Sequence, residues 1–191
     1  NLAYYYFGFV SASRGCQNSC IFCCQHIISQ NVFRSIPLKN VIAELDILIN
    51  KYNQKIITFV DDNFLSDRER VRELCDLICE KGLHKKAAFD CQARCDGIDS
   101  SILNYLRKTN FRSINFGLET GSERLMALIN KSETVAQNEA AVRLAKKHHF
   151  QVSATFLMGL PTETAEDRRA TFKLAQRLSM SYLTFKSAVP F

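Results

Sequence analysis

Strand-like and helix-like patterns alternate along this chain, and that alternation restricts the fold more than any other feature. Six short runs have the apolar, β-branched or aromatic character of strands, at residues 4–12, 55–60, 87–91, 113–118, 152–158 and 182–189. Apolar residues at helical spacing follow each of the first five runs. A strand–helix repeat of this kind predicts an α/β fold with parallel strands and helical crossovers.

Length and composition are those of one globular domain. The chain has 191 residues, of which 47% are apolar and 23% charged, so it can bury a substantial core and disorder is not expected. It has no apolar run of membrane-spanning length and no signal peptide at its start. We therefore expect residues 1–191 to form one domain of a cytoplasmic protein without membrane contact. Because the chain starts and stops almost on predicted strands, we expect it to be a fragment of a longer protein.

The positive charge is modest and spread along the sequence. The net charge is +6, and the densest basic run, residues 146–149, lies at the end of a predicted helix. Cations there complement the helix dipole, so we interpret the run as a solvated helix end and not as a nucleic-acid patch. A nucleic-acid substrate stays open on this evidence.

Four cysteines stand within nine residues, in a stretch that reads RGCQNSCIFCCQH. Cys16, Cys20 and Cys23 have C-x3-C-x2-C spacing, and Cys24 follows at once. Three thiolates this close together can hold one face of an iron–sulfur cube and leave its fourth iron open to another ligand. A zinc knuckle and a disulfide cluster are the alternatives, although zinc sites usually pair two short hairpins and no second C-x2-C is present.

Polar or glycine residues follow the later predicted strands. They are Asp61 and Asp62 after the second, Arg94 after the third, Glu119 after the fourth and Gly159 after the fifth. Right-handed crossovers place the carboxyl ends of parallel strands on one face, and the cysteine loop follows the first strand. A large polar cofactor across that face would need such residues, whereas a zinc knuckle would not.

These stretches resemble the radical S-adenosylmethionine (radical SAM) superfamily over nearly the whole chain. The matching segments read SRGCQNSCIFC, FVDDNF, QARCD, FGLETGS, INKS, FLMGLPTET and SAVPF. Within the superfamily they most resemble the group associated with cobalamin-binding domains, the methylthiotransferases and the Elongator-like enzymes. Two departures are Cys24 directly after the motif and Asn18 at a position that is often aromatic or basic. Neither changes the three ligands.

The resemblance implies a partial, TIM-like (β/α)6 barrel without its last helix. It implies a 4Fe–4S cluster on Cys16, Cys20 and Cys23, with SAM on the open iron. An electron from an external donor then cleaves SAM to methionine and a 5'-deoxyadenosyl radical, which takes hydrogen from an unidentified substrate, a small molecule in preference to tRNA. Cobalamin, held by a neighbouring domain, is a candidate further cofactor.

The resemblance also implies the polar contacts to SAM. Asp61 or Asp62 receives the ammonium group, although both cannot point into the barrel mouth, and a turn pair is the alternative. Arg94 suits the carboxylate, with a surface salt bridge as the alternative. Glu119 is expected at the ribose, and a helix cap is its alternative.

Three further residues are expected to contact SAM, of which Gly159 and Phe22 would lie beside the adenine. Gly159 and Val189 would offer backbone contacts, and Phe22 would cover the ring; a tight turn and a loop anchor are the alternatives for Gly159 and Phe22. Cys24 and Cys95 are interpreted as packing thiols, with a second redox role as the alternative. The competing functional hypothesis is a zinc- or iron–sulfur-binding interaction module without catalysis. A phosphate-handling barrel enzyme is disfavoured because no glycine-rich phosphate loop is present.

Overall fold

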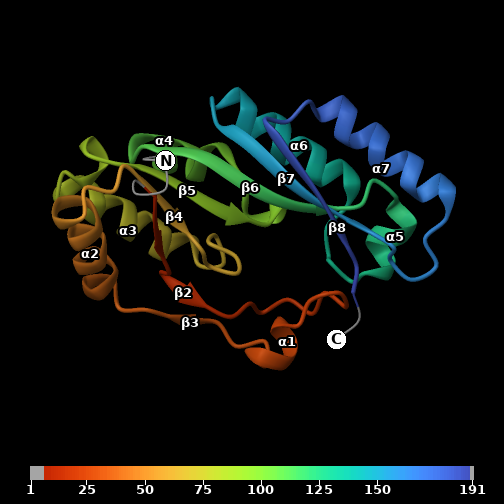
Figure 1. Cartoon of the computed structure of the whole chain (residues 1–191), viewed down its shortest axis with the longest axis horizontal. Helices are drawn as coiled ribbons and strands as arrows, with labels where there is room; N and C mark the ends of the chain where they lie inside the picture. Colours follow the sequence, from red (N-terminus) through yellow and green to blue (C-terminus); the bar gives the residue numbers. More distant parts are fainter. Residues whose placement is uncertain (1–6, 190–191) are drawn as a thin grey trace.

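Six parallel strands form one open sheet in the computed structural model, which describes residues 7–189 (Figure 1). In pairing order they are β1 (Phe7–Val10), β4 (Ile56–Phe59), β5 (Ala88–Ala93), β6 (Phe111–Glu119), β7 (Gln151–Met158) and β8 (Tyr182–Ser187). Every neighbouring pair is parallel. The parallel α/β fold predicted from the strand–helix repeat is confirmed. Residues 4–6 of the predicted first strand lie outside the described residues.

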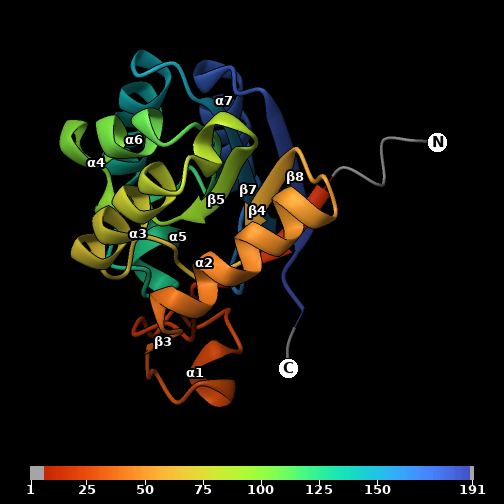
Figure 2. The same ribbon diagram turned by 90° about the vertical axis from the view of Figure 1, so that its left-hand side faces the viewer.

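The helices connect successive strands. They are α1 (Gln25–Ile28), α2 (Leu38–Asp46), α3 (Arg68–Glu80), α4 (Ser100–Lys108), α5 (Glu123–Leu128), α6 (Val135–Lys147) and α7 (Ala165–Leu178), with a π-helical extension of α2 at Ile47–Lys51. Figure 2 shows α3, α4 and α6 on the same side of the sheet. Within the described residues, every helix is too short or too polar to cross a lipid bilayer.

Side-chain caps fix where the helices begin. The spacing of Thr164 and Asp167 predicts a capping box at the start of α7, and the structure confirms it: each side chain bonds the other residue's backbone. The spacing of Ser66 and Glu69 also predicts a capping box, at the start of α3, and this prediction is wrong. Asp67 caps that helix instead, because its carboxylate accepts from the backbone N–H of Arg70.

The two faces of the sheet differ. Side chains that face the helices are apolar and buried, such as Phe59 and Phe116. Gln92, Asn115 and Ser153 lie on the other face as register partners across β5, β6 and β7, and none is fully buried. The near-continuous apolar run at residues 55–60 is typical of a strand buried on both faces, but β4 is fully buried on only one. Ile57 and Phe59 are buried, whereas Ile56 and Thr58 are partly exposed.

The cysteine loop leaves the sheet after β1 and lies along its carboxyl-end edge (Figure 1). The short strands β2 (Ser13–Arg14) and β3 (Arg34–Ser35) pair at its base and carry α1 between them. Gly15 has a φ of +86°, and a Cβ there would lie 2.2 Å from the carbonyl oxygen of Val32. The close approach of the two arms therefore needs a glycine.

Candidate functional site

A pocket of about 370 Å³ opens at the carboxyl ends of the strands, under the cysteine loop. Residues of the cysteine loop form one wall, and residues of β5, β6, β7 and β8, together with Asp62, Arg94 and Lys131 from the connections between elements, form the rest. Seven residues predicted from the sequence line it: Cys16, Cys20, Phe22, Cys23, Asp62, Arg94 and Glu119. The structure thus brings together residues as far apart in the chain as Cys16 and Glu119.

A second pocket of about 480 Å³ adjoins the first, because Phe22 and Leu157 line both. Its walls also include Gly159, Leu160 and Val189. Phe22, Gly159 and Val189, the three further residues predicted to contact SAM, therefore line the same pocket. Gly159 has a φ of +76°, and a Cβ there would meet nothing within 4 Å, so this glycine serves the turn after β7. Most of the side chains that line this pocket are apolar.

The three thiols of the motif face the first pocket with hydrogen-bond donors beside them. Asn18 Nδ2 lies 3.1 Å from Cys16 Sγ, and Arg94 Nη1 lies 3.7 Å from Cys20 Sγ. Burial raises the pKa of Cys20 and Cys23, and the Arg94 charge opposes this rise at Cys20. A thiolate there needs cations or a metal to be stable.

The donor set fits an iron–sulfur cluster. All eight cysteines are free thiols, so no disulfide cluster is formed. Among residues 7–189, no three His, Cys, Asp or Glu side chains are grouped to hold one metal ion. In a four-iron cluster, three thiolates bind three different irons, which suits three separate thiols around one cavity. Cys16, Cys20 and Cys23 are the residues that would hold it.

The two aspartates after β4 have different positions. Asp61 is buried away from the pocket, where it accepts from the backbone N–H of Ala12 at 3.0 Å and from the Ser13 hydroxyl. Asp62 lines the pocket and accepts from the Gly15 N–H at 2.8 Å and from Gln25 Nε2 at 2.7 Å. Asp61 therefore anchors the start of the loop, and Asp62 is the one that faces the cavity.

Arg94 is buried beside the loop, and protein atoms surround its guanidinium. Its Nε and Nη2 donate to Asp96 at 3.0 and 2.7 Å, and Nη2 also donates to the Lys131 carbonyl at 2.6 Å. Only Nη1, beside Cys20, has no oxygen partner within the described residues. The surface salt bridge considered from the sequence does not describe this buried group.

Glu119 ends β6 in a strained conformation. Its φ is +61°, which is unfavourable for a residue with a side chain, and the pairing with β7 shifts register there. Its Oε1 lies 3.1 Å from Lys131 Nζ, and both side chains are buried. Burial opposes the charge of Lys131, but Glu119 and Glu133 outweigh it, so the pKa of Lys131 is raised and the amine stays protonated.

Several lining residues were not assigned a role from the sequence. Lys131 lies in the recognised INKS segment, and Glu133 follows two residues later, but neither ends a strand. Glu133 pairs with Lys131 but does not itself line the pocket. The other polar lining residues without an assigned role are Asn18, Gln25, Gln92, Asn115, Thr155 and Lys186. Of the two cysteines interpreted as packing thiols, Cys95 is buried, whereas Cys24 is exposed, so the interpretation is wrong for Cys24.

Comparison with known proteins identifies the family of the chain. The family model "Radical SAM superfamily" matches residues 10–175. An uncharacterized methyltransferase of Pyrococcus horikoshii is 31% identical over 185 residues, which are 97% of this chain and 40% of the relative. The anaerobic magnesium-protoporphyrin IX monomethyl ester cyclase of Cereibacter sphaeroides is 28% identical over 165 residues, 85% of this chain and 27% of the cyclase. The chain thus spans less than half the length of these relatives.

Among solved structures, the radical S-adenosylmethionine methyltransferase TsrM of Kitasatospora setae, determined with cobalamin and a 4Fe–4S cluster bound, superposes with a TM-score of 0.88. The match covers 98% of this chain and 35% of TsrM at 19% identity, so it is evidence for the fold alone. It confirms the partial-barrel type of fold. With the family model matching most of its length, the chain belongs to the radical SAM superfamily, whose enzymes use a 4Fe–4S cluster and SAM.

Proposed function

We propose that this chain is the catalytic core of a radical SAM enzyme in which Cys16, Cys20 and Cys23 bind the cluster. One observation carries the proposal: the three thiols of one loop line the same pocket as the polar residues at the strand ends. When bound, the cluster supplies one electron, received from an external donor, that cleaves SAM to methionine and a 5'-deoxyadenosyl radical able to take hydrogen from a substrate.

The two adjoining pockets match the two ends of SAM. The first pocket presents Asp62 and Glu119 beside the thiols, and these carboxylates suit the ammonium group and the ribose hydroxyls. The second pocket presents Phe22 and the backbone of Gly159 and Val189, which suit the flat adenine. Asp61 supports this arrangement from behind, because it holds the backbone where the cysteine loop begins.

The polar side chains on the inner face of the sheet suit a polar substrate. Gln92, Asn115 and Thr155 line the pocket below the cysteine loop, and Asp90 stands on the same face of β5 as Gln92. Burial raises the pKa of Asp90. Amides, hydroxyls and one carboxyl group favour a small molecule that carries hydrogen-bond donors and acceptors.

Methyl transfer with cobalamin is the second candidate. One relative is named a methyltransferase, and TsrM is a methyltransferase whose structure contains cobalamin. Methyl transfer from SAM leaves S-adenosylhomocysteine, whereas reductive cleavage gives 5'-deoxyadenosine. The two candidates therefore differ in a measurable product.

The test is anaerobic reconstitution of the purified protein with iron and sulfide, followed by SAM and dithionite. We expect the visible absorbance of an iron–sulfur cluster and the appearance of 5'-deoxyadenosine in mass spectrometry. The triple variant Cys16→Ala, Cys20→Ala, Cys23→Ala should lose both. As a matched control, Cys24→Ala should retain both, because this exposed thiol lies beside the motif but outside the ligand set.

A non-catalytic module gives a different result. If the protein holds zinc alone, or holds a cluster but produces neither 5'-deoxyadenosine nor S-adenosylhomocysteine, the proposal fails. Addition of hydroxocobalamin to the same assay decides the second candidate, which requires S-adenosylhomocysteine in amounts that depend on cobalamin.

A further inference from the structure

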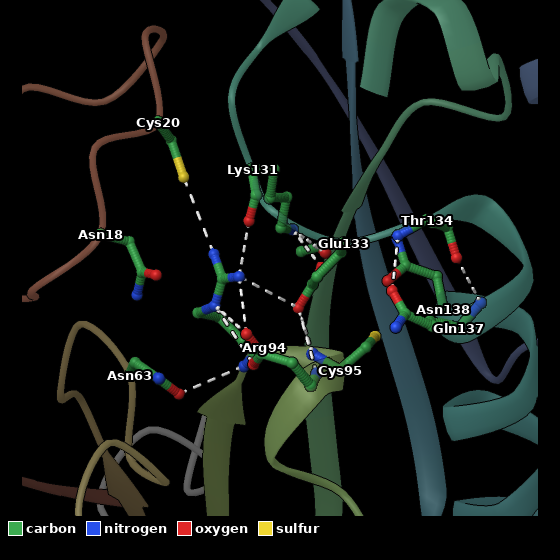
Figure 3. A network of polar contacts seen from close by, with 12 residues as sticks. Asn18, Cys20, Asn63, Arg94, Cys95, Lys131, Glu133, Thr134, Gln137 and Asn138 are labelled. Carbon is green, nitrogen blue, oxygen red and sulfur yellow. Dashed lines mark hydrogen bonds and ion pairs between the residues drawn. The ribbon is translucent and has the colours of Figure 1, made fainter. Parts of the chain in front are cut away.

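Arg94 meets the motif cysteines in a way that SAM binding does not explain. Its side chain is 9% exposed, and it follows β5 directly. The Nη1 nitrogen lies 3.7 Å from Cys20 Sγ, while Nε and Nη2 donate to oxygens of Asp96 and Lys131. The guanidinium is planar and rigid, so these contacts aim its remaining edge at the sulfur (Figure 3).

Glu133 fixes this arrangement from behind. Its side chain is fully buried, and its Oε1 accepts from the backbone N–H groups of Cys95 and Asp96 at 2.8 and 3.2 Å. The same oxygen lies 3.6 Å from Arg94 Nη2, and Oε2 lies 3.4 Å from Lys131 Nζ. Figure 3 shows the guanidinium between Cys20 and Glu133. The cation thus stands nearer the thiol than the carboxylate does.

The motif sulfurs differ in the donors beside them. Cys16 accepts from Asn18, a neutral amide, whereas Cys20 accepts from Arg94, a full positive charge. Lys131 is a second buried cation, and its backbone carbonyl accepts a hydrogen bond from Arg94 Nη2. Cys20 therefore has a cationic donor next to its sulfur, and the carboxylates of Asp96 and Glu133 pair with the edge of the guanidinium that faces away from the sulfur.

A cation that donates to a ligating sulfur favours the more negative state of the cluster. Reduction adds one electron to the cluster and its thiolates, and a buried charge stabilises that electron more strongly than a solvent-exposed one does. Hydrogen bonds to the sulfurs are among the factors that set cluster potentials. A charged donor should therefore raise the reduction potential more than a neutral donor does.

We propose that Arg94, held by Asp96 and Glu133, is a positioning residue that acts through Cys20 to raise the reduction potential of the cluster, with Lys131 as a supporting charge. The inference rests on the proposed function, because it requires the cluster on Cys16, Cys20 and Cys23. It gives Arg94 a role that exists before SAM binds, in place of the carboxylate contact expected from the sequence.

The test is a redox titration of the reconstituted protein, followed by electron paramagnetic resonance, first without SAM and then with it. Arg94→Gln removes the charge and should lower the equilibrium constant for reduction at least tenfold in the absence of SAM, which is about 59 mV for one electron. Arg94→Lys keeps the charge without the fork and should show a smaller shift. Asn18→Ala, the matched neutral donor, should shift least.

Lys131→Gln keeps the test decisive if Arg94→Gln fails to load a cluster. This variant removes the supporting charge without touching a sulfur, and it should lower the potential in the same direction as Arg94→Lys. Iron content and circular dichroism confirm that each variant is loaded and folded.

An unchanged potential in SAM-free Arg94 variants, together with a higher Kd for SAM, would overturn the inference and make Arg94 a SAM contact. Equal shifts in Arg94→Gln and Asn18→Ala would also contradict it. Failure of the proposed function looks different, since then the wild-type protein itself forms no cluster or cleaves no SAM.

Discussion

The two faces of the central sheet come from the same strands but differ in burial and in polarity. On the outer face, Phe59, Phe89 and Phe111 pack ring to ring with centroids 5.4 to 6.1 Å apart, beneath the helices. On the inner face, Asn115 and Ser153 form a hydrogen bond at 3.0 Å and stay partly exposed. Alternation along each strand therefore separates the residues that stabilise the fold from those that meet ligands.

The difference indicates where substitutions should matter for stability and where for function. Burial of apolar area is the main stabilising contribution, and most of it comes from the outer face. The inner face forgoes that contribution and gains polar groups that can recognise SAM and a substrate. The predictions below test how sharp this division is.

The largest loss of stability is expected for Phe116→Ala on the outer face. Phe116 is fully buried in β6, so its truncation should cost about 3 to 5 kcal/mol in the free energy of unfolding. Asn115→Ala, one residue away on the inner face, should cost about 1 kcal/mol. Urea unfolding monitored by circular dichroism measures both. Equal losses would show that the inner face is part of the core.

Glu133→Ala should give the next largest effect, because Glu133 is the fully buried centre of a charged network with Arg94 and Lys131, which line the pocket. The substitution leaves Lys131 and Arg94 short of a partner and two backbone N–H groups unpaired, for a loss of about 3 kcal/mol. Glu133→Gln keeps an oxygen for those N–H groups and should lose less. If both variants unfold like the wild type in urea, the network does not stabilise the fold.

The sequence predicted the fold well because strand and helix patterns are local. Apolar runs and caps such as Thr164 with Asp167 need only a few neighbouring residues. The cysteine motif was equally clear, since its ligands lie within eight residues of one another. All three motif cysteines line the pocket, as expected for a cluster site.

The charged network could not be predicted, because its members meet only in the folded chain. Arg94 and Lys131 are 37 residues apart, and Lys131 lies in a helix break that carries no strand-end signal. The choice between Asp61 and Asp62 was also open, since sequence does not show which way each side chain turns after β4. Contacts with Ala12 and Ser13 decide it in the structure.

A smaller, pH-dependent effect on the Tm is expected for Asp167, which forms hydrogen bonds with several polar groups at the start of α7. Hydrogen bonds from Arg124, Ser122 and the Thr164 backbone hold the pKa of Asp167 well below its usual range. An acid with a lowered pKa stabilises the fold above its unfolded pKa of about 3.9, and this stabilisation is lost as the pH falls through the folded pKa. Asp167→Asn should therefore lower the Tm by a few degrees at neutral pH.

The difference in Tm between wild type and Asp167→Asn should shrink as the pH is lowered below about 4. Thermal melts from pH 7 down to pH 2 measure it. Glu166→Gln, at an exposed position in the same turn of α7, is the matched control and should leave the Tm nearly unchanged. A difference that stays constant with pH would show that Asp167 acts through its shape and not through its charge.

The last prediction changes no residue and tests how firmly the outer face is packed, through the reactivity of thiols outside the motif. Cys75 lies in α3 beneath the outer face, where burial raises its pKa to about 12. Only the thiolate reacts with iodoacetamide. At pH 8, Cys75 should therefore react about a thousandfold more slowly in the folded protein than in urea, where an ordinary thiol pKa of about 8.5 returns.

Cys24 provides the internal control, because this thiol is already exposed in the folded chain and should be labelled at similar rates in both conditions. Peptide mass spectrometry follows both residues in one sample. Rapid labelling of Cys75 in the folded protein would mean that α3 opens readily from the sheet. The outer face would then be a dynamic layer, and the separation between a rigid apolar face and an accessible polar face would not hold.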